Sequence, residues 1–246
     1  MTSAIDYSVQ GSVAVFTMMT AENRHNPDFL FSFHQHLDTV EKNQSIGAVV
    51  LTSASKKNWS LGIDLEWMAD PENDASDNAQ FMSDVTGLLK RMINYPVPII
   101  AALNGHTFGN GSVLACACDF RFMKSDKGFF CFPEVDVFVP FFPSMFPLIN
   151  KAIPQAFFNR LAMTGERVGA QQLLANQVVE AIFDDEQALF DGAMNFASEL
   201  KKNRWIYGQN KSQMNKYITA AMDYEDPEFI EKMSVMLTNM MQKGKI

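Results

Sequence analysis

The chain has 246 residues, a length that suits one large α/β domain or a domain with a small appendage. Its net charge of -8 argues against a nucleic-acid-binding surface, because phosphate backbones are bound by clustered Lys and Arg. No apolar run approaches the roughly 20 residues of a membrane-spanning helix. The first residues also lack the basic start and apolar core of a signal peptide. We therefore expect a cytoplasmic protein with no nucleic-acid or membrane partner.

Three cysteines, Cys116, Cys118 and Cys131, are too few for a disulfide scaffold, and an odd, closely spaced set fits a reducing compartment. A metal site at Cys116 and Cys118 would need a second pair of cysteines or a cluster of histidines nearby, and the sequence has neither. We therefore expect no metal, and these cysteines to pack in the core.

Helices and strands are predicted from the period of the apolar residues and from Gly and Pro punctuation. Asn26-Pro27 begins the first predicted helix, and Pro96 and Pro98 follow the second. In chain order we expect a strand at 12–18 with a hairpin partner before it, a helix at 28–43, a strand at 47–52, a polar loop at 53–60, a helix at 78–95, a strand at 99–103, a helix at 111–118, strands at 120–123 and 128–132, a strand at 178–182, a helix at 186–202 and an amphipathic helical segment at 206–243.

Strand–strand–helix units thus recur through the first two thirds of the chain, and helices dominate the last third. The sequence contains no repeat and no low-complexity linker. We expect one α/β domain, with a core at 1–200 and a helical C-terminal region at 201–246.

Two glycine-containing loops, 59–65 and 104–115, stand where a strand is expected to lead into a helix. Glycine permits positive φ and close approach of a ligand. The first amides of a helix are free donors and carry partial positive charge. One such loop alone is weak evidence for a site, because many strand-to-helix turns are rich in glycine for structural reasons.

The two loops are followed by Cys118-Asp119-Phe120-Arg121 and Pro133-Glu134-Val135-Asp136. In this order and separation they resemble the enoyl-CoA hydratase/isomerase (crotonase) superfamily, and residues 119–139 are most similar to its 3,2-enoyl-CoA isomerases. The resemblance implies an α/β crotonase (ClpP-like) superhelix of repeated strand–strand–helix units with a helical C-terminal region. It also implies a homotrimer or a dimer of trimers, with the C-terminal region 201–246 as the oligomerisation element.

The resemblance further implies that the backbone amides of Ile63 and Asn110 form an oxyanion hole for the thioester carbonyl. The family usually has glycine at the position of Asn110. Its hydratases use two glutamates, and one of those positions is occupied here by Val113. The other is Glu134. Because valine cannot transfer a proton, efficient hydration is disfavoured.

One carboxylate is sufficient for isomerisation of a 3-enoyl thioester to the trans-2-enoyl thioester. It removes a proton from the alpha carbon, giving a dienolate, and returns the proton to the gamma carbon. Phe132 and the apolar residues 138–142 predict a raised pKa for Glu134, which would help it act as base and then as acid. The resemblance thus implies an enoyl-CoA isomerase in which Glu134, Ile63 and Asn110 are catalytic, with no cofactor besides the coenzyme A of the substrate.

The coenzyme A groove implied by the resemblance is built from residues of the two loops and from one arginine. Lys56 and Lys57 are further candidates for the phosphates, although lone basic residues on loops are usually only solvated. Residues 138–146 either wall the acyl pocket or pack in the core. The implied binding residues are Arg24, Ser60, Leu61, Gly62, Ile63, Asp64, Gly109 and Gly111.

Other functions stay open. A hydratase or acyl-CoA hydrolase would use Glu134 with water, a carbon–carbon bond-forming or bond-cleaving enzyme would use the same oxyanion hole, and a non-catalytic subunit would only bind acyl-CoA. Dienoyl-CoA isomerases carry a further acid where this chain has Phe142, so that activity is disfavoured. Structural roles are expected for Asp136, His106 and Ser112.

Overall fold

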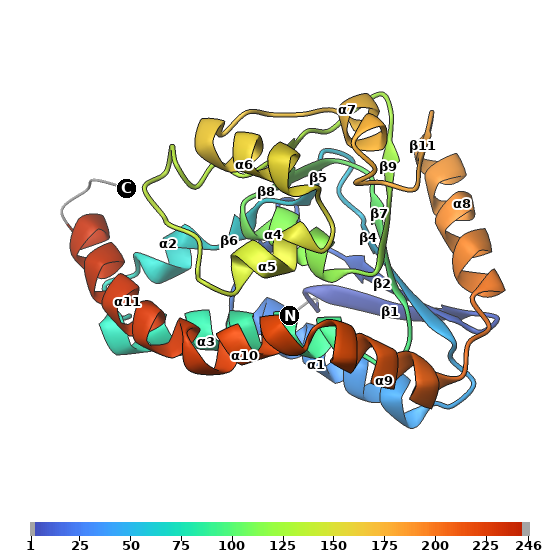
Figure 1. Ribbon diagram of the computed structural model, residues 1–246, viewed down its shortest axis with the longest axis horizontal. Coiled ribbons are helices and arrows are strands. Elements are labelled where there is room, and N and C mark those ends of the chain that lie inside the picture. Colours follow the sequence, from blue (N-terminus) through green and yellow to red (C-terminus); the bar gives the residue numbers. More distant parts are fainter. Residues whose placement is uncertain (1–2, 243–246) are drawn as a thin grey trace.

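The computed structural model describes residues 3–242, which form a central sheet with helices on both sides (Figure 1). The strands are β1 (Ile5–Gln10), β2 (Val13–Met18), β3 (Arg24–His25), β4 (Ala48–Ser53), β5 (Asn58–Ser60), β6 (Gly62–Ile63), β7 (Ile99–Leu103), β8 (His106–Phe108), β9 (Phe120–Lys124), β10 (Phe130–Cys131) and β11 (Ala181–Phe183). The helices are α1 (Pro27–Lys42), α2 (Leu65–Met68), α3 (Ala75–Ile93), α4 (Asn110–Ala117), α5 (Met145–Asn150), α6 (Gln155–Thr164), α7 (Ala170–Ala175), α8 (Glu186–Glu199), α9 (Arg204–Met214), α10 (Lys216–Tyr224) and α11 (Asp226–Gln242).

The largest sheet has six strands in the order β1-β2-β4-β7-β9-β11. β1 and β2 form the predicted antiparallel hairpin, and every other neighbouring pair is parallel. Gly11 lies in the hairpin turn with φ +62°, a backbone conformation that glycine adopts without strain. The crossovers between parallel strands give the strand–strand–helix repetition that the sequence predicts.

Both faces of this sheet are buried, which explains why its central strands are almost continuously apolar. Val49 and Leu51 of β4 point into the main core, whereas Ala48 and Val50 point to a smaller core on the opposite face. That smaller core is closed by α8, which lies alone on its side of the sheet (Figure 1). The remaining helices and the two small sheets lie on the other side.

A three-stranded sheet, β10-β8-β5, and a two-stranded sheet, β3-β6, bring the two glycine-containing loops together. β8 pairs in parallel with both β5 and β10, and β6 pairs in parallel with β3. The expected polar loop at 53–60 is wrong at its end, because Asn58–Ser60 is the strand β5. The strand expected at 128–132 is shorter than predicted, since only Phe130 and Cys131 pair with β8. Figure 1 shows β5, β6 and β8 close to α4, so these short strands hold the two loops beside this helix.

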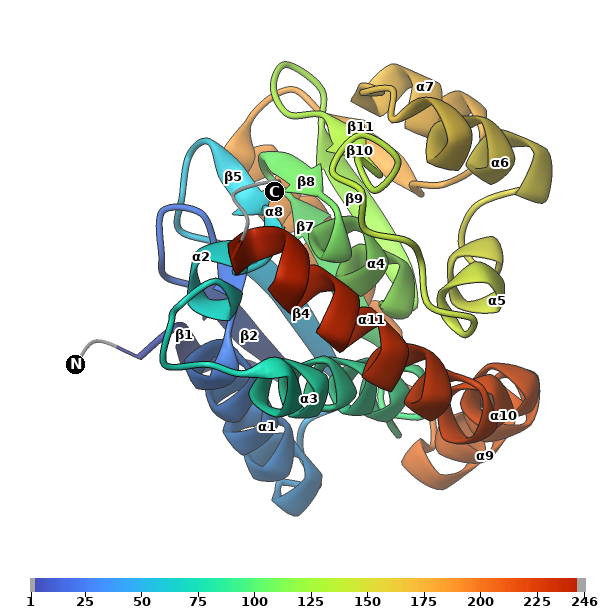
Figure 2. The ribbon, with the colours of Figure 1, turned by 90° about the vertical axis from the view of Figure 1, so that its left-hand side faces the viewer.

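The C-terminal segment expected at 206–243 consists of three helices, α9, α10 and α11, and Lys243 lies outside the described residues. Pro227 stands in the first turn of α11, where its missing N–H leaves no helical hydrogen bond unmade. Figure 2 shows α11 lying across α3, and α10 packs against α5. Asp226 also accepts a hydrogen bond of 3.0 Å from the Ser144 amide. The C-terminal helices therefore pack on the core of their own chain.

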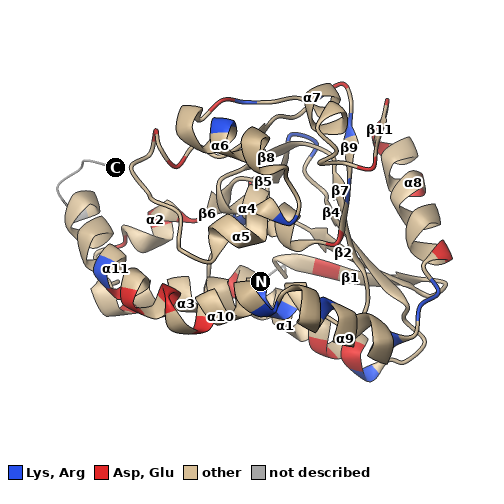
Figure 3. Ribbon diagram, in the orientation of Figure 1, with Lys and Arg blue, Asp and Glu red and all other residues tan. Residues whose placement is uncertain are grey.

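The remaining predicted bounds differ by a few residues at most places. α3 begins at Ala75 rather than at 78, because Asp74 caps it by accepting from the amides of Ser76 and Asp77. The last strand covers Ala181–Phe183 rather than 178–182, and α8 ends at Glu199 rather than at 202. Among the described helices none is both long and apolar enough to cross a membrane. Figure 3 shows acidic and basic residues interspersed over the helices α1, α3 and α9–α11.

Candidate active site

The first loop lies between β5 and α2 and is held against β3. The Asp64 amide donates to the His25 carbonyl at 2.9 Å, as expected in a parallel pair. Backbone groups of successive strand residues face opposite edges, so the amide of Ile63 points away from β3. Gly62 has φ +82°, and a Cβ atom there would lie 2.7 Å from the amide nitrogen of Asn110. Glycine at 62 therefore lets the two loops come into backbone contact.

The second loop leads from β8 into α4, a helix whose eight residues are all buried. Gly109 precedes the helix with φ +55°, and its carbonyl accepts from the Val113 amide at 3.2 Å. The first amides of a helix have no acceptor within it, so those of Asn110 and Gly111 are free donors at the positive end of the helix. Ile63 and Asn110, whose amides were expected to form the oxyanion hole, thus line the same cavity.

Glu134 lies in the turn after β10, which is closed by a 3.0 Å hydrogen bond from the Val137 amide to the Pro133 carbonyl. Its carboxylate faces the second loop, since a Cβ atom on Gly109 would lie 3.8 Å from Glu134 Oε1. Glu134 Oε2 is buried and has no hydrogen-bond partner among the described residues. Burial raises the pKa of Glu134 to about 7, against a smaller lowering by a backbone hydrogen bond. The predicted direction of this pKa is confirmed.

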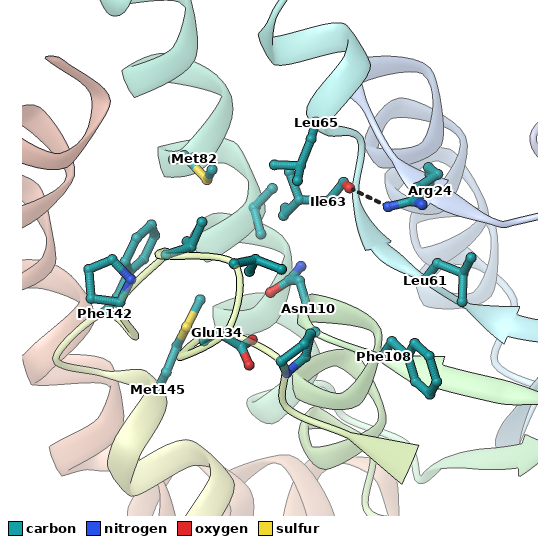
Figure 4. A pocket seen from close by; sticks show the side chains of 16 residues that line it. Arg24, Leu61, Ile63, Leu65, Met82, Phe108, Asn110, Glu134, Phe142 and Met145 are labelled. Atoms are coloured by element: carbon teal, nitrogen blue, oxygen red, sulfur yellow. Dashed lines mark hydrogen bonds between the residues drawn. The ribbon is translucent and has the colours of Figure 1, made fainter. Parts of the chain in front are cut away.

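A cavity of about 290 Å³ joins the two loops to Glu134. Figure 4 shows Asn110 and Glu134 next to each other, with Phe142 and Met145 on one side and Ile63 above them. The lining of the cavity is almost entirely apolar. It comprises Arg24, Leu61, Ile63, Leu65, Met82, Val85, Phe108, Gly109, Asn110, Pro133, Glu134, Val137, Val139, Pro140, Phe142 and Met145. An alkyl chain fits such a surface, and Glu134 is the one carboxylate among these lining residues.

The structure brings together six of the residues predicted for the site: Arg24, Leu61, Ile63, Gly109, Asn110 and Glu134 all line the cavity. Four predicted binding residues do not line it: Ser60, Gly62, Asp64 and Gly111. Ser60 and Gly62 are buried within the first loop, and Asp64 caps α2 by accepting from the Trp67 amide at 3.1 Å. Gly111 packs against the Ser60 backbone.

The basic residues proposed for phosphates are separated. The Arg24 guanidinium lies at the cavity, where it donates to the Ile63 carbonyl at 3.3 Å and forms an ion pair with Glu22. Lys56 and Lys57 line another hollow, together with His106 and Lys127.

The apolar segment 138–146, expected either to wall the pocket or to pack in the core, walls the cavity in part. Val139, Pro140, Phe142 and Met145 line the cavity, whereas the side chain of Phe138 is 63% exposed to solvent. Val113 is fully buried and is not one of the lining residues, so no acid occupies its side of the cavity.

Ser112 and the cysteines were expected to have structural roles, and their contacts and burial agree with this expectation. Ser112 Oγ donates to the carbonyls of Thr107 and Cys131 at 2.7 and 2.9 Å. Cys116 and Cys118 are fully buried in the core and free. Within residues 3–242 no three His, Cys, Asp or Glu side chains are grouped so as to hold a metal ion. Asp136 is exposed and lies beside Gly165 rather than in the cavity lining.

A buried polar network that joins the two loops through His25 was not predicted. Asn110 Nδ2 lies 2.8 Å from His25 Nδ1, and His25 Nε2 lies 2.9 Å from Ser60 Oγ. Ser60 Oγ donates to the Asn23 carbonyl at 2.8 Å. Burial, with a smaller effect of the nearby Arg24 charge, lowers the pKa of His25 to about 3. No local pattern connects His25 with a residue 85 positions away, so sequence reasoning lacked a signal for it.

The fold and the cavity define an α/β protein in which two glycine-containing loops border an apolar pocket. The sequence model of the enoyl-CoA hydratase/isomerase family matches residues 8–245. The chain belongs to this family and has its crotonase fold.

Two sequence relatives agree with this placement, and one solved structure agrees with the fold. The chain is 26% identical over 187 residues to the enoyl-CoA delta isomerase 3 of Arabidopsis thaliana, covering 75% of this chain and 79% of that protein. It is 36% identical over 152 residues to a carnitinyl-CoA dehydratase of Escherichia coli, covering 61% of this chain and 56% of that protein. The crystal structure of an enoyl-CoA hydratase/isomerase family protein from Pseudomonas syringae superposes with a TM-score of 0.85 at 23% identity, covering 94% of this chain and 98% of that one.

Proposed function

We propose that the protein is an enoyl-CoA isomerase that converts 3-enoyl-CoA to trans-2-enoyl-CoA. The observation that carries this proposal is a single buried carboxylate, Glu134, in an apolar cavity beside two loops with free backbone amides. The Arabidopsis relative bears the name of an enoyl-CoA delta isomerase, which supports the same reaction class.

In the proposed reaction the thioester oxygen accepts hydrogen bonds from the amides of Ile63 and Asn110. Ionised Glu134 removes the proton from the alpha carbon, and the electron pair passes into the carbonyl to give a dienolate. The two amides stabilise the negative charge that gathers on the oxygen. The electron pair then returns through the conjugated system, and the neutral carboxylic acid protonates the gamma carbon.

The raised pKa of Glu134 favours this double role. A carboxyl group whose pKa is about 7 is partly ionised and partly neutral near neutral pH, so it serves as a base and then as an acid with little energetic penalty in either step. The same proton leaves and returns and no electron is lost to an acceptor, so the proposed reaction needs neither a metal nor a redox cofactor.

Hydration is the less favoured reaction on this scaffold. It requires one group to orient and deprotonate a water molecule while a proton is delivered to the alpha carbon. Val113 occupies the position where the family's hydratases have their other glutamate. Valine can neither deprotonate a water molecule nor deliver a proton. Hydratase, hydrolase and binding-only roles are therefore outcomes that the following experiment must distinguish.

The test is ultraviolet absorbance after mixing the protein with 3-hexenoyl-CoA. Conjugation of the new double bond with the thioester carbonyl raises the absorbance. We expect the wild type to give this rise and Glu134→Gln to lose it, because the amide keeps the shape but cannot accept the proton. Asp136→Asn, a matched change two residues away and outside the cavity lining, is expected to keep the activity.

Other results would redirect the assignment. Binding of the CoA ester without any rise in absorbance contradicts isomerisation of this substrate. Release of free coenzyme A would indicate hydrolysis, and a rise that persists in Glu134→Gln would mean that another group is the base.

The finer features of the assignment are also proposals. We propose that Arg24 and the first loop hold the coenzyme A part of the substrate, with the acyl chain in the apolar cavity. The cytoplasmic location and the role of 201–246 in oligomerisation remain predictions.

A further inference from the structure

The side chain of Asn110 connects the two loops whose amides form the proposed oxyanion hole. Asn110 belongs to the second loop, and its side chain is only 6% exposed. Its Nδ2 atom lies 2.8 Å from Nδ1 of His25, a residue of β3, the strand against which the first loop is paired. His25 in turn lies 2.9 Å from Ser60, which immediately precedes that loop's glycine turn.

The direction of each hydrogen bond that connects Asn110, His25, Ser60 and Asn23 can be assigned. The Asn23 carbonyl only accepts, so the Ser60 hydroxyl donates to it at 2.8 Å. Ser60 Oγ must then accept from His25, which places the ring proton on Nε2. A neutral imidazole with its proton on Nε2 has an acceptor at Nδ1, which matches the Asn110 Nδ2 donor. The pKa of His25, lowered to about 3 by burial, keeps the ring neutral at physiological pH.

We propose that Asn110 is a positioning residue that holds the two oxyanion-hole amides at the correct separation through its hydrogen bond to His25. The proposal rests on the proposed function, because it assumes that the amides of Ile63 and Asn110 bind the thioester oxygen. The backbone amide of Asn110 is held in position because the residue begins α4. The side chain of Asn110 holds the Ile63 amide in position through His25 and Ser60.

The other side of the same carboxamide argues against a purely structural role. Asn110 Oδ1 is buried and has no hydrogen-bond partner among the described residues. An unpaired buried acceptor costs about 1–3 kcal/mol. Glycine would avoid this penalty at the first position of α4. The carboxamide is thus a poor choice for stability alone, whereas it is the group that couples the second loop to the first.

The experiment measures carbonyl polarisation without turnover. A cinnamoyl-CoA thioester with a dimethylamino substituent at the far end of the ring absorbs at longer wavelength when hydrogen bonds draw charge to its carbonyl. We expect a red shift on binding to the wild type and a smaller shift in Asn110→Ala. With 3-hexenoyl-CoA as substrate, kcat should fall roughly ten-fold in this variant while KM changes less than about two-fold, because misplaced donors weaken the transition state more than the ground state.

His25→Phe separates positioning from direct contact. His25 is not among the residues that line the cavity, so it has no direct contact through which to polarise the ligand. Phenylalanine keeps the aromatic contact with Phe29 but removes both ring nitrogens. We expect the same loss of red shift as in Asn110→Ala, and no further loss in the double variant, since both changes break one connection. Asn176→Ala, which removes a carboxamide whose Nδ2 donates to the Gln172 carbonyl of α7, is the matched control.

The outcomes are distinct. A full red shift in Asn110→Ala, or a loss there with a full shift in His25→Phe, overturns the positioning role while leaving the proposed function intact. A wild type that binds the thioester without any shift overturns the oxyanion hole itself, and this proposal with it. Circular dichroism establishes that the variants are folded. Should His25→Phe not fold, Ser60→Ala takes its place and should lose the red shift, because it breaks the same connection at a residue that does not line the cavity either.

Discussion

Glu134 combines two properties that oppose each other. Its carboxylate has to be ionised to act as a base, yet it lies in an apolar cavity where Oε2 has no partner within the described residues. Burial raises its pKa from 4.5 to about 7. The folded protein therefore binds this proton more tightly than the unfolded chain does, and ionising Glu134 weakens folding.

The first prediction is a pH-dependent difference in stability between the wild type and Glu134→Gln. Because the folded pKa is raised, the stability that the neutral acid contributes is present below about pH 4.5 and is lost as pH rises through about 7. The shift corresponds to about 3 kcal/mol. Denaturant unfolding at several pH values should show the variant gaining about this much relative to the wild type between these limits. A difference that stays constant with pH would contradict the raised pKa.

The second prediction concerns the rate. The proposed reaction begins with ionised Glu134, so kcat/KM for 3-hexenoyl-CoA should rise with pH and level off above about pH 7. The measurement is the absorbance rate from about pH 4 to about pH 9. A profile with its midpoint near pH 4.5 would mean that the carboxylate is solvated in the working enzyme.

At the residue scale the sequence was informative where a residue type follows a motif. Glu134, Ile63 and Asn110 were identified by resemblance, and all three line one cavity. His25 was not identified, because its importance arises from a contact between segments 85 residues apart. The unpaired Asn110 Oδ1 likewise exists only in the folded packing.

Among the elements, the contact between the two loops depends on Gly62. A Cβ atom at this position would lie 2.7 Å from the Asn110 nitrogen and 2.8 Å from the Phe108 carbonyl oxygen, and φ +82° is itself unfavourable for other residues. The third prediction is that Gly62→Ala forces the loops apart and displaces the Asn110 amide. Loss of one oxyanion donor lowers kcat by roughly 10²–10³. Absorbance kinetics with 3-hexenoyl-CoA measure this loss.

The matched control is Gly87→Ala in the exposed part of α3, where an added Cβ atom meets nothing within 4 Å. This change should leave the rate unaltered and stabilise the fold by about 0.5–1 kcal/mol, because alanine is the better helix former. Equal rates for Gly62→Ala and the wild type would show that the loops tolerate separation and that the Asn110 amide is not needed.

Elements of the large sheet could be predicted because β-branched and apolar runs such as 99–103 are long enough to show a pattern. β5, β6, β8 and β10 have two or three residues each, too few for a period, and they form only because the neighbouring segments pair with them. The division of 206–243 into three helices had a local signal at Asp226-Pro227. The earlier division, at Asn215, depends on a tertiary contact, since the Asn215 side chain donates to the Ile93 carbonyl.

For the whole molecule, the C-terminal helices carry both buried and exposed apolar side chains. Met222, Ile230 and Leu237 are buried against the core. Several large side chains of α9 and α10 are exposed: Trp205, Ile206, Met214, Tyr217 and Tyr224. Exposed apolar groups gathered on neighbouring elements are typical of protein–protein interfaces.

The last prediction is that exposed side chains of α9 and α10, Trp205 and Tyr217 among them, form the contact between protomers of a homo-oligomer. Trp205 is 69% and Tyr217 75% exposed in the single chain, and burying both on association would remove a large apolar area from water. Light scattering after size-exclusion chromatography should give a multiple of the 27.7 kDa protomer mass for the wild type. Trp205→Lys combined with Tyr217→Lys should shift the mass towards one protomer, because a buried interface does not accommodate unpaired charges.

Met163→Lys is the control for this pair, since Met163 is 75% exposed on α6, a helix remote from α9 in Figure 1. It should leave the mass unchanged. If Met163→Lys dissociates the protein and the double variant does not, the contact lies on the opposite side of the molecule. If the wild type has the mass of one protomer, the exposed side chains of α9 and α10 have another role. Activity measured on the same samples then tells whether the cavity, which is lined within one chain, works without association.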